Sequence, residues 1–231
     1  MKLKKELFMK EMIENPDTRS MSSKSFDIEK NSFDIIEEEI GKHTYTKEFE
    51  WEIVRRVIHA TADFDFAGKQ KLLFNHDPIL SGFQAIENKC NIITDVEMVR
   101  AGISKNSLKK LNLKCICNIS DDNIIFEAKR LNKTRAEVAM RNLGEEMQGG
   151  IIVVGNAPTA LHEVIRMVIE KLTIPSLVIG VPVGFVSAVE SKIELSKTRI
   201  PHITNIGRKG GSSVASSIIN ALMLLYLNKF K

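Results

Sequence analysis

The chain contains 231 residues, of which 43% are hydrophobic and 27% are charged, and its formal net charge at pH 7 is +4. These proportions are ordinary for a soluble globular protein and exclude collagen-like, disordered and disulfide-stabilised scaffolds. The small positive excess is spread along the chain, so it predicts no nucleic-acid partner, although it suits an acidic small ligand.

The three cysteines form no even-numbered set for disulfide bonds, which predicts a reducing, cytoplasmic setting. The N-terminal segment is not typical of a signal peptide, because charged residues interrupt its apolar stretch after three positions. The longest apolar run, residues 214–227, contains polar residues and is shorter than the roughly 20 residues that a bilayer requires. We therefore expect no contact with a membrane.

Residues 1–25 are polar and lack a clear period, so we expect a loosely ordered leader followed by a single domain over residues 26–231. A near-repeat follows, Ser25-Phe26-Asp27-Ile28 and then Ser32-Phe33-Asp34-Ile35. Since seven residues return to the same face of a helix, this repeat predicts two turns of one amphipathic helix. A second helix is expected from Thr46 to about Thr61.

From residue 90 onward, short apolar runs alternate with helix-start signals. Five runs have the length of buried strands: residues 91–94, 114–119, 150–155, 176–181 and 202–206. Alternating strands and helices predict an α/β fold, here a three-layer αβα arrangement with a mostly parallel sheet of about five strands.

Several helix starts are marked by their side chains. Thr94-Asp95-Val96-Glu97 and Thr134-Arg135-Ala136-Glu137 both fit the capping box, in which the first and fourth side chains satisfy free backbone donors. In Asn156-Ala157-Pro158, the proline suits a first helical turn, where its missing N–H is not needed. We therefore expect helices to begin at these three positions.

Ligands of such sheets bind outside the carboxyl ends of the strands, and unusual residues gather there. Asp95, Asn156 and residues 182–185 each follow a predicted strand, and a glycine-rich, doubly basic turn at 207–213 leads into a helix. The free N–H groups of such a helix start favour an anion. Arg135, in a first helical turn, is placed to clamp a carboxylate.

Each of these features also has a structural interpretation. The glycine pair is typical of a turn that needs positive φ, Asp95 of a helix cap, and Arg135 of a solvated side chain. The spacing matches neither the dinucleotide nor the nucleoside-triphosphate motif. Cys115 and Cys117 share one face of a strand with no further ligand nearby, which favours buried thiols over a metal site.

Among the five histidines, His59 stands at the end of an amphipathic helix with small residues beside it. An imidazole in that position is able to transfer protons near neutral pH. The alternative is a structural histidine stabilised by the negative end of the helix dipole.

Six segments carry specific patterns: IHATAD (58–63), NIITDVEMVRAGI (91–103), NKTRAEVA (132–139), VVGNAPTAL (153–161), GVPVGFVSAVESK (180–192) and GRKGGSSVASSIINAL (207–222). Taken in order, they resemble the precorrin-8X methylmutase family, or precorrin isomerases, of the corrin branch of tetrapyrrole synthesis. The resemblance extends over about residues 30–225.

The resemblance implies an isomerase of cobalamin biosynthesis that moves a methyl group from C-11 to C-12 of precorrin-8X or of its cobalt complex, giving hydrogenobyrinate or cobyrinate. It implies a homodimer without an added cofactor, since any cobalt belongs to the substrate. The family's catalytic histidine corresponds to His59, which would exchange a proton with the macrocycle. Ser32 and Arg135 correspond to residues that contact the corrinoid; Ser25 repeats the serine, but its spacing to His59 favours Ser32.

A corrin precursor carries several acid arms and therefore needs several anion sites. The helix starts near Asn156 and Ser212, together with Arg135, Arg208 and Lys209, are expected to supply them. Two other functions remain open: a non-catalytic tetrapyrrole-binding or carrier protein on the same fold, and a nucleotide-binding Rossmann enzyme. A paired proton donor and arginine favour the isomerase, and the missing phosphate motifs disfavour the Rossmann enzyme.

Overall fold

The computed structural model describes residues 23–47 and 49–230, so most of the expected leader over residues 1–25 lies outside the described residues. The elements in chain order are α2 (Ser23–Ile40), α3 (Glu50–Thr61), the 3-10 helix η2 (Phe64–Ala67), β1 (Leu72–Asn75), α4 (Pro78–Glu87), β2 (Ile92–Thr94), α5 (Glu97–Gly102), α6 (Lys105–Leu111), β3 (Cys115–Ile116), α7 (Asp122–Leu131), α8 (Arg135–Asn142), β4 (Ile151–Val154), α9 (Pro158–Ile169), β5 (Leu177–Gly180), α10 (Ala188–Ser196), β6 (His202–Asn205) and α11 (Ser212–Phe230).

The described strands form one sheet in the order β1-β6-β5-β4-β2-β3. All neighbouring strands are parallel except β1, which pairs antiparallel with β6 at one edge. The five predicted strands are therefore confirmed, although residues 114–119 shorten to the two-residue β3. The edge strand β1 was not predicted, because its four residues are only half-buried for the most part and show no clear alternation.

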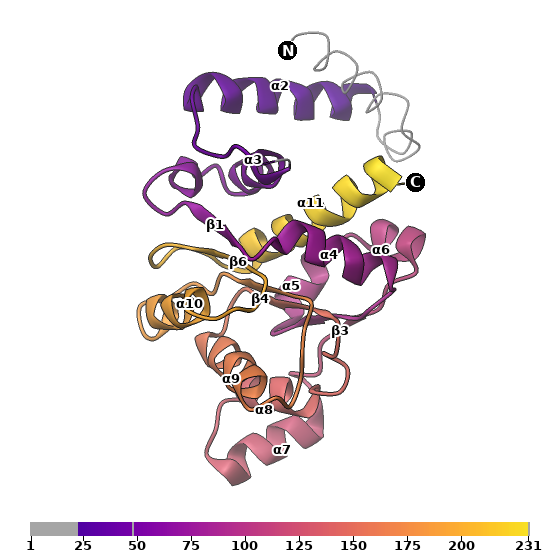
Figure 1. Ribbon diagram of the computed structural model, residues 1–231, viewed down its shortest axis with the longest axis vertical. Helices are drawn as coiled ribbons and strands as arrows, with labels where there is room; N and C mark the ends of the chain where they lie inside the picture. Colours follow the sequence, from indigo (N-terminus) through magenta and orange to yellow (C-terminus); the bar gives the residue numbers. More distant parts are fainter. Residues whose placement is uncertain (1–22, 48, 231) are drawn as a thin grey trace.

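Alternate residues of the central strands face opposite sides of the sheet, as strand geometry requires. Ile151 and Val153 of β4 belong to one core, whereas Ile152 and Val154 belong to the other. The first core is covered by α3, α4, α5 and α11, and the second by α8, α9 and α10. Figure 1 shows these two groups of helices on either side of the sheet, which confirms the αβα layering.

The near-repeat forms one continuous helix, α2, as predicted. Phe33 and Ile36 are buried against the body of the protein, whereas Ile28 and Ile35 on another face are more than half exposed. The helix lies across α3 in Figure 1, and Glu29 forms an ion pair with Arg56 of α3, with 3.1 Å between Glu29 Oε1 and Arg56 Nη1. The position of α2 thus depends on contacts with the helix that carries His59.

Two predicted helix starts were wrong. α3 begins at Glu50 rather than Thr46, because Phe49 takes a left-handed conformation with φ 68°. α5 begins at Glu97 after an extended Val96, so Thr94 does not form the expected capping box. The other two starts are confirmed: Thr134 accepts from the Glu137 N–H, and Pro158 opens α9.

The central helix α11 is long and apolar enough to meet the length and composition of a membrane span, but 61% of it is buried inside the protein. Its side chains pack against α3, α4, α5 and the sheet. This burial is typical of a core helix of a globular domain.

Candidate active site

A groove of about 480 Å³ opens where the end of α3 meets the loop between α5 and α6 and the first half of α11. We call it the serine groove, because five of its lining residues are serines. The lining residues are Arg56, His59, Ala60, Gly102, Ser104, Asn106, Ser107, Ser213, Ser216, Ser217, Asn220, Ala221 and Leu224.

One wall of the serine groove is a polar stripe on the otherwise apolar α11. Ser213, Ser216, Ser217 and Asn220 recur at intervals of three, one and three residues, which places them on one face of the helix. These polar side chains line the serine groove along two turns of α11.

Asn220 fastens this wall to the opposite one. Its Oδ1 accepts from the Ser104 N–H, and its Nδ2 donates to the Gly102 carbonyl, both at 2.8 Å. Ser217 Oγ donates to the Arg56 carbonyl at 3.0 Å, which joins α11 to α3. Because these side chains bond to backbone on neighbouring elements, the walls of the serine groove are fixed relative to one another.

His59 lies in the last turn of α3, and its side chain is exposed at the serine groove. The Phe33 ring of α2 lies 5.1 Å from the imidazole, centroid to centroid. No hydrogen bond to the ring is found among the residues that the structure describes. Both ring nitrogens are therefore free to bond a ligand, which is what proton transfer requires.

Ser32, one position before Phe33, is partly exposed, and its hydroxyl donates to the Ile28 carbonyl of its own helix at 2.8 Å. It shares a helix face with Ile28 and Ile35, which are 58% and 55% exposed. Ser32 therefore lies on α2, one residue before the Phe33 ring that contacts His59. It does not belong to the lining of the serine groove.

The turn after β4, which leads into Asn156, lies against the first turn of α11 at the carboxyl edge of the sheet. An added Cβ at Gly155 would lie 3.0 Å from the Ser212 Cα and 2.8 Å from the Ala215 Cβ. Only glycine allows the turn after β4 to approach the first turn of α11 this closely. Because Ser213 lines the serine groove, this turn continues the same surface.

Asp95 does not cap the helix that follows it. Its fully buried carboxylate accepts three backbone hydrogen bonds across the sheet, from Gly155 at 3.1 Å and from Asn156 and Ala157 at 2.8 Å. A carboxylate holds backbone donors more strongly than a neutral acceptor does. Asp95 therefore sets the conformation of the turn that carries Asn156.

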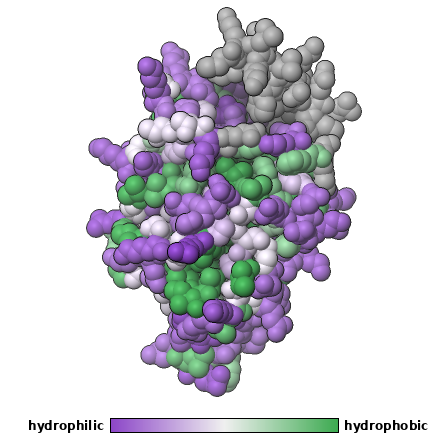
Figure 2. All heavy atoms as spheres, in the orientation of Figure 1, coloured by the Kyte–Doolittle hydropathy of each residue, from purple (hydrophilic) through white to green (hydrophobic). Residues whose placement is uncertain are grey.

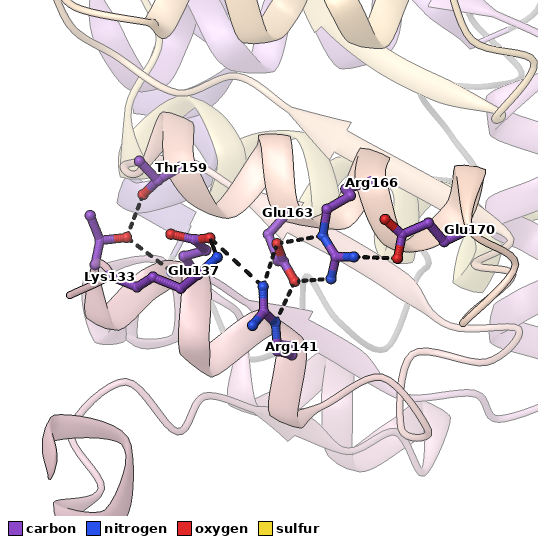
Figure 3. Close-up of polar contacts among 8 residues, drawn as sticks. Lys133, Glu137, Arg141, Thr159, Glu163, Arg166 and Glu170 are labelled. Atoms are coloured by element: carbon purple, nitrogen blue, oxygen red, sulfur yellow. Dashed lines mark hydrogen bonds and ion pairs between the residues drawn. The ribbon is translucent and has the colours of Figure 1, made fainter. Parts of the chain in front are cut away.

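Arg135 begins α8 and is exposed, without an ion-pair partner in the described part of the chain. Its helix is held to α9 by the network in Figure 3, where two arginines from different helices converge on Glu163. Arg141 Nε donates to Glu163 Oε1 at 2.9 Å, and Arg166 Nε donates to Glu163 Oε2 at 3.0 Å. Arg135 is thus a free guanidinium on a firmly held helix.

At the other end of the network, the Thr134 and Thr159 hydroxyl groups bond at 2.8 Å. This contact joins the residue before Arg135 to the first turn of α9, three residues after Asn156. The start of α8 is therefore brought beside the turn that Asp95 holds. The starts of α8, α9 and α11 thus lie along the carboxyl edge of the sheet, and substrate contact by Arg135, Asn156 and Ser212 stays a prediction.

We expect the Glu163 network to contribute to stability in a pH-dependent way. Burial alone would raise the pKa of this carboxyl, but hydrogen bonds from Arg166 and Arg141 outweigh burial and lower the pKa to about 2. Because the folded pKa lies below the unfolded value near 4.5, this stabilisation is complete above pH 4.5 and is lost as the pH falls towards 2.

In urea unfolding, Glu163→Gln should lower the free energy of unfolding at pH 7 by roughly 2 kcal/mol and flatten its decline between pH 4.5 and 2. The exposed Glu145→Gln is the matched control. A Glu163→Gln variant as stable as the wild type would show that the network carries no net stability.

Lys209, expected to meet a ligand anion, is instead already paired. Its Nζ lies 2.7 Å from Asp63 Oδ2 and 2.8 Å from Asp65 Oδ2, and these carboxylates raise its pKa. The two aspartates lie just beyond the end of α3, so Lys209 ties the glycine-rich turn to the segment after His59. Arg208 remains exposed, with its guanidinium 5.6 Å from the Phe185 ring.

Cys115 and Cys117 are half-buried thiols. Burial raises the pKa of Cys115 to about 12 and also raises that of Cys117. Within the described residues, no group of three or more potential metal ligands was found.

A second groove, of about 510 Å³, lies between α9 and α10. Its lining is mostly apolar, including Ile169, Ile174 and Pro201, and Figure 2 shows an apolar patch on this side of the molecule. Because its residues precede β5 and β6, it lies at the amino ends of the strands. The serine groove is the better candidate site, since it combines the carboxyl end of the sheet with groups able to bond and transfer protons.

Sequence reasoning missed Arg56 and the serines of α11. The spacing of Ser213, Ser216 and Ser217 on an apolar helix is a signal that was available. Arg56, three residues before His59, lies on the same helix face as the histidine.

Comparison with known proteins identifies the family to which the chain belongs. The model of the family described as precorrin-8X methylmutase matches residues 27–225 of the chain. The chain belongs to the precorrin-8X methylmutase family. Among its relatives is the cobalt-precorrin-8 methylmutase of Priestia megaterium, which is 48% identical over 198 residues, or 86% of this chain and 87% of the relative.

A second relative is the cobalt-precorrin-8 methylmutase of Leptospira interrogans, which is 45% identical over 215 residues, or 90% of this chain and 96% of the relative. The crystal structure of precorrin-8x methyl mutase from Thermus thermophilus matches with a TM-score of 0.80 and 34% identity, over 87% of this chain and 96% of that one. The methylmutase therefore shares its fold as well as its sequence with proteins of this activity.

Proposed function

We propose that this methylmutase acts on cobalt-precorrin-8 and moves the methyl group from C-11 to C-12 of the ring. The observation that carries the proposal is His59, an exposed imidazole at the serine groove with both nitrogens free, in a chain 48% identical to a cobalt-precorrin-8 methylmutase. Cobalt is then part of the substrate, and the protein supplies proton transfer and orientation.

His59 is proposed to act as general acid and base. Protonation of the conjugated ring determines which tautomer is present, and only some tautomers place the C-11 methyl next to an electron-poor C-12. Because the reaction is an isomerisation, the proton that His59 gives at one step is recovered at another, and no atoms are gained or lost. A positioned acid–base group contributes a rate factor of about 10²–10⁴.

Binding of the acid arms is proposed to extend from the serine groove along the carboxyl edge. A groove of about 480 Å³ is within the usual range for a drug-sized ligand, so a macrocycle with several arms would reach beyond it. Arg135, the N–H groups near Asn156 and the first turn of α11 at Ser212 offer the separate anion sites that such arms need. Ser32 is proposed to contact the ring from α2.

Arg135→Ala should weaken binding of the corrinoid product by roughly 1.5–3 kcal/mol, the range for a charge-assisted hydrogen bond. The free guanidinium has no structural partner among the described residues, so the fold should be unchanged. Equilibrium titration followed by absorption measures the affinity, with exposed Arg130→Ala as the control. An affinity equal to that of the wild type would remove Arg135 from the site.

The choice of substrate is tested by measuring kcat/KM with cobalt-precorrin-8 and with metal-free precorrin-8X under the same anaerobic conditions. The proposal predicts a higher kcat/KM for the cobalt complex. A higher value for the metal-free ring would assign the protein to the other branch, and binding without turnover of either ring would favour a carrier protein.

A cytoplasmic homodimer is part of the proposal and rests on the resemblance to the family. Phe185 and Val186, 85% and 82% exposed at the carboxyl edge, are an apolar surface that a second copy or the ring would cover. Sedimentation equilibrium near 52 kDa would support the dimer, and a mass of 26.0 kDa at all concentrations would contradict it.

A further inference from the structure

Lys192 is a buried cation that the proposed mechanism does not use. It lies on α10 and is only 2% exposed. Its Nζ donates to the Lys209 carbonyl at 2.8 Å and to Asn205 Oδ1 at 3.2 Å. No carboxylate pairs with it anywhere in the described ranges 23–47 and 49–230.

This arrangement costs stability. Both acceptors are neutral, and burial lowers the pKa of Lys192 to about 8. A buried cation loses its hydration and regains only part of that free energy from neutral acceptors, a cost that an apolar side chain in the same position does not have. The stability of the fold therefore does not explain an ammonium group at this position. The groups to which the ammonium donates hydrogen bonds offer an explanation.

The ammonium holds the glycine-rich turn that leads into α11. Asn205 Nδ2 also donates to the Lys209 carbonyl, at 3.0 Å, so one carbonyl receives two buried donors. The next residue, Gly210, has φ 151°, and a Cβ there would lie 2.2 Å from the Val181 carbonyl oxygen. The turn therefore packs closely against the residue after β5, and Lys192 holds it through the hydrogen bond to the Lys209 carbonyl.

The glycine-rich turn that Lys192 holds is connected to two walls of the serine groove. Towards α3, the Lys209 side chain is paired with Asp63 and Asp65, just after the helix that carries His59 in its last turn. Towards α11, the turn sets the position of Ser212 and of Ser213 in the serine groove. A shift in the Lys209 backbone would therefore move both walls.

We propose that Lys192 is a positioning residue for the methyl shift, which orders the turn at residues 207–211 and through it the segment after His59 and the first turn of α11. This inference rests on the proposed function. It separates stability from activity: removing the cation should leave the fold as stable as before while the site loses its order.

The test compares Lys192→Met with Lys192→Gln and with the exposed control Lys197→Met, each as the full chain. Lys192→Met should change the melting temperature by no more than a few degrees, because removal of the buried charge offsets the loss of the donor to Asn205 Oδ1. Its kcat/KM should fall about 100-fold, the scale for a small displacement of a positioned group. Lys192→Gln, which retains a neutral donor, should recover part of the loss, and Lys197→Met should behave as the wild type.

Hydrogen exchange provides a readout that does not depend on turnover. In Lys192→Met, amides of residues 206–213 should exchange about tenfold faster, while those of β4 and β5 stay protected. Faster exchange throughout the protein with a lower melting temperature would show a merely structural role and overturn the inference, as would unchanged exchange in the turn. If the wild type lacks methylmutase activity, the proposed function fails, and the exchange result still decides whether Lys192 holds the turn.

Discussion

Replacing His59 by alanine should lower kcat for the methyl shift by about 10²–10⁴-fold, the contribution expected of a positioned acid–base group. Binding of the product should change little, because the imidazole is exposed and forms no hydrogen bond with the residues described around the serine groove. Absorption-monitored kinetics and a binding titration measure the two effects separately.

The control for this variant is Phe33→Leu, which removes the ring 5.1 Å from the imidazole but keeps the titratable group. It should reduce activity far less than His59→Ala does. If His59→Ala turns over the substrate at the wild-type rate, the proposed role of His59 in proton transfer is wrong. If its affinity falls as far as its rate does, His59 serves in binding rather than in chemistry.

The second large effect is expected at Asp95. Asp95→Ala should lower the free energy of unfolding by about 3 kcal/mol or more, because three backbone donors lose a charged acceptor and at least that of Gly155 is buried. Urea unfolding measures the change, which should appear as a lower midpoint with an unchanged slope.

Asp95→Asn is the matched variant, since its single carbonyl oxygen can keep part of the three bonds. It should lose about half as much stability as Asp95→Ala. Both variants should also bind the corrinoid more weakly, because the turn that carries Asn156 is no longer fixed. A loss below about 1 kcal/mol for Asp95→Ala would show that the turn holds its shape without the carboxylate.

The sheet was largely predictable because buried parallel strands read as continuous apolar runs. β4 and β5 are fully buried on both faces, and their predicted ranges fell within two residues of the observed bounds. β1 was missed because its apolar run, Leu72-Leu73-Phe74, is only three residues long, and most of this edge strand is only partly buried. The start of α3 was misplaced because nothing local marks Phe49 as a residue of positive φ.

Candidate site residues could be selected from the sequence where a single residue carries the signal, whereas contacts between distant residues could not. His59 and Arg135 stand in segments that resemble the family; both are exposed, and their roles stay predictions. Asp95 receives its hydrogen bonds from residues about 60 positions away, and Lys209 meets Asp63 across 146 positions. Such pairings are set by the packing of α3, α11 and the strands, which no local pattern encodes.

The most direct test of the account is to mix the purified protein with cobalt-precorrin-8 and follow the visible spectrum over time, beside the same reaction with His59→Ala. A methyl shift reorganises the conjugated system, so the wild type should convert the substrate spectrum into that of cobyrinate, while the variant should bind the substrate and leave the spectrum unconverted. A spectrum that stays that of the bound substrate with the wild type, or conversion at the same rate by His59→Ala, would contradict the account.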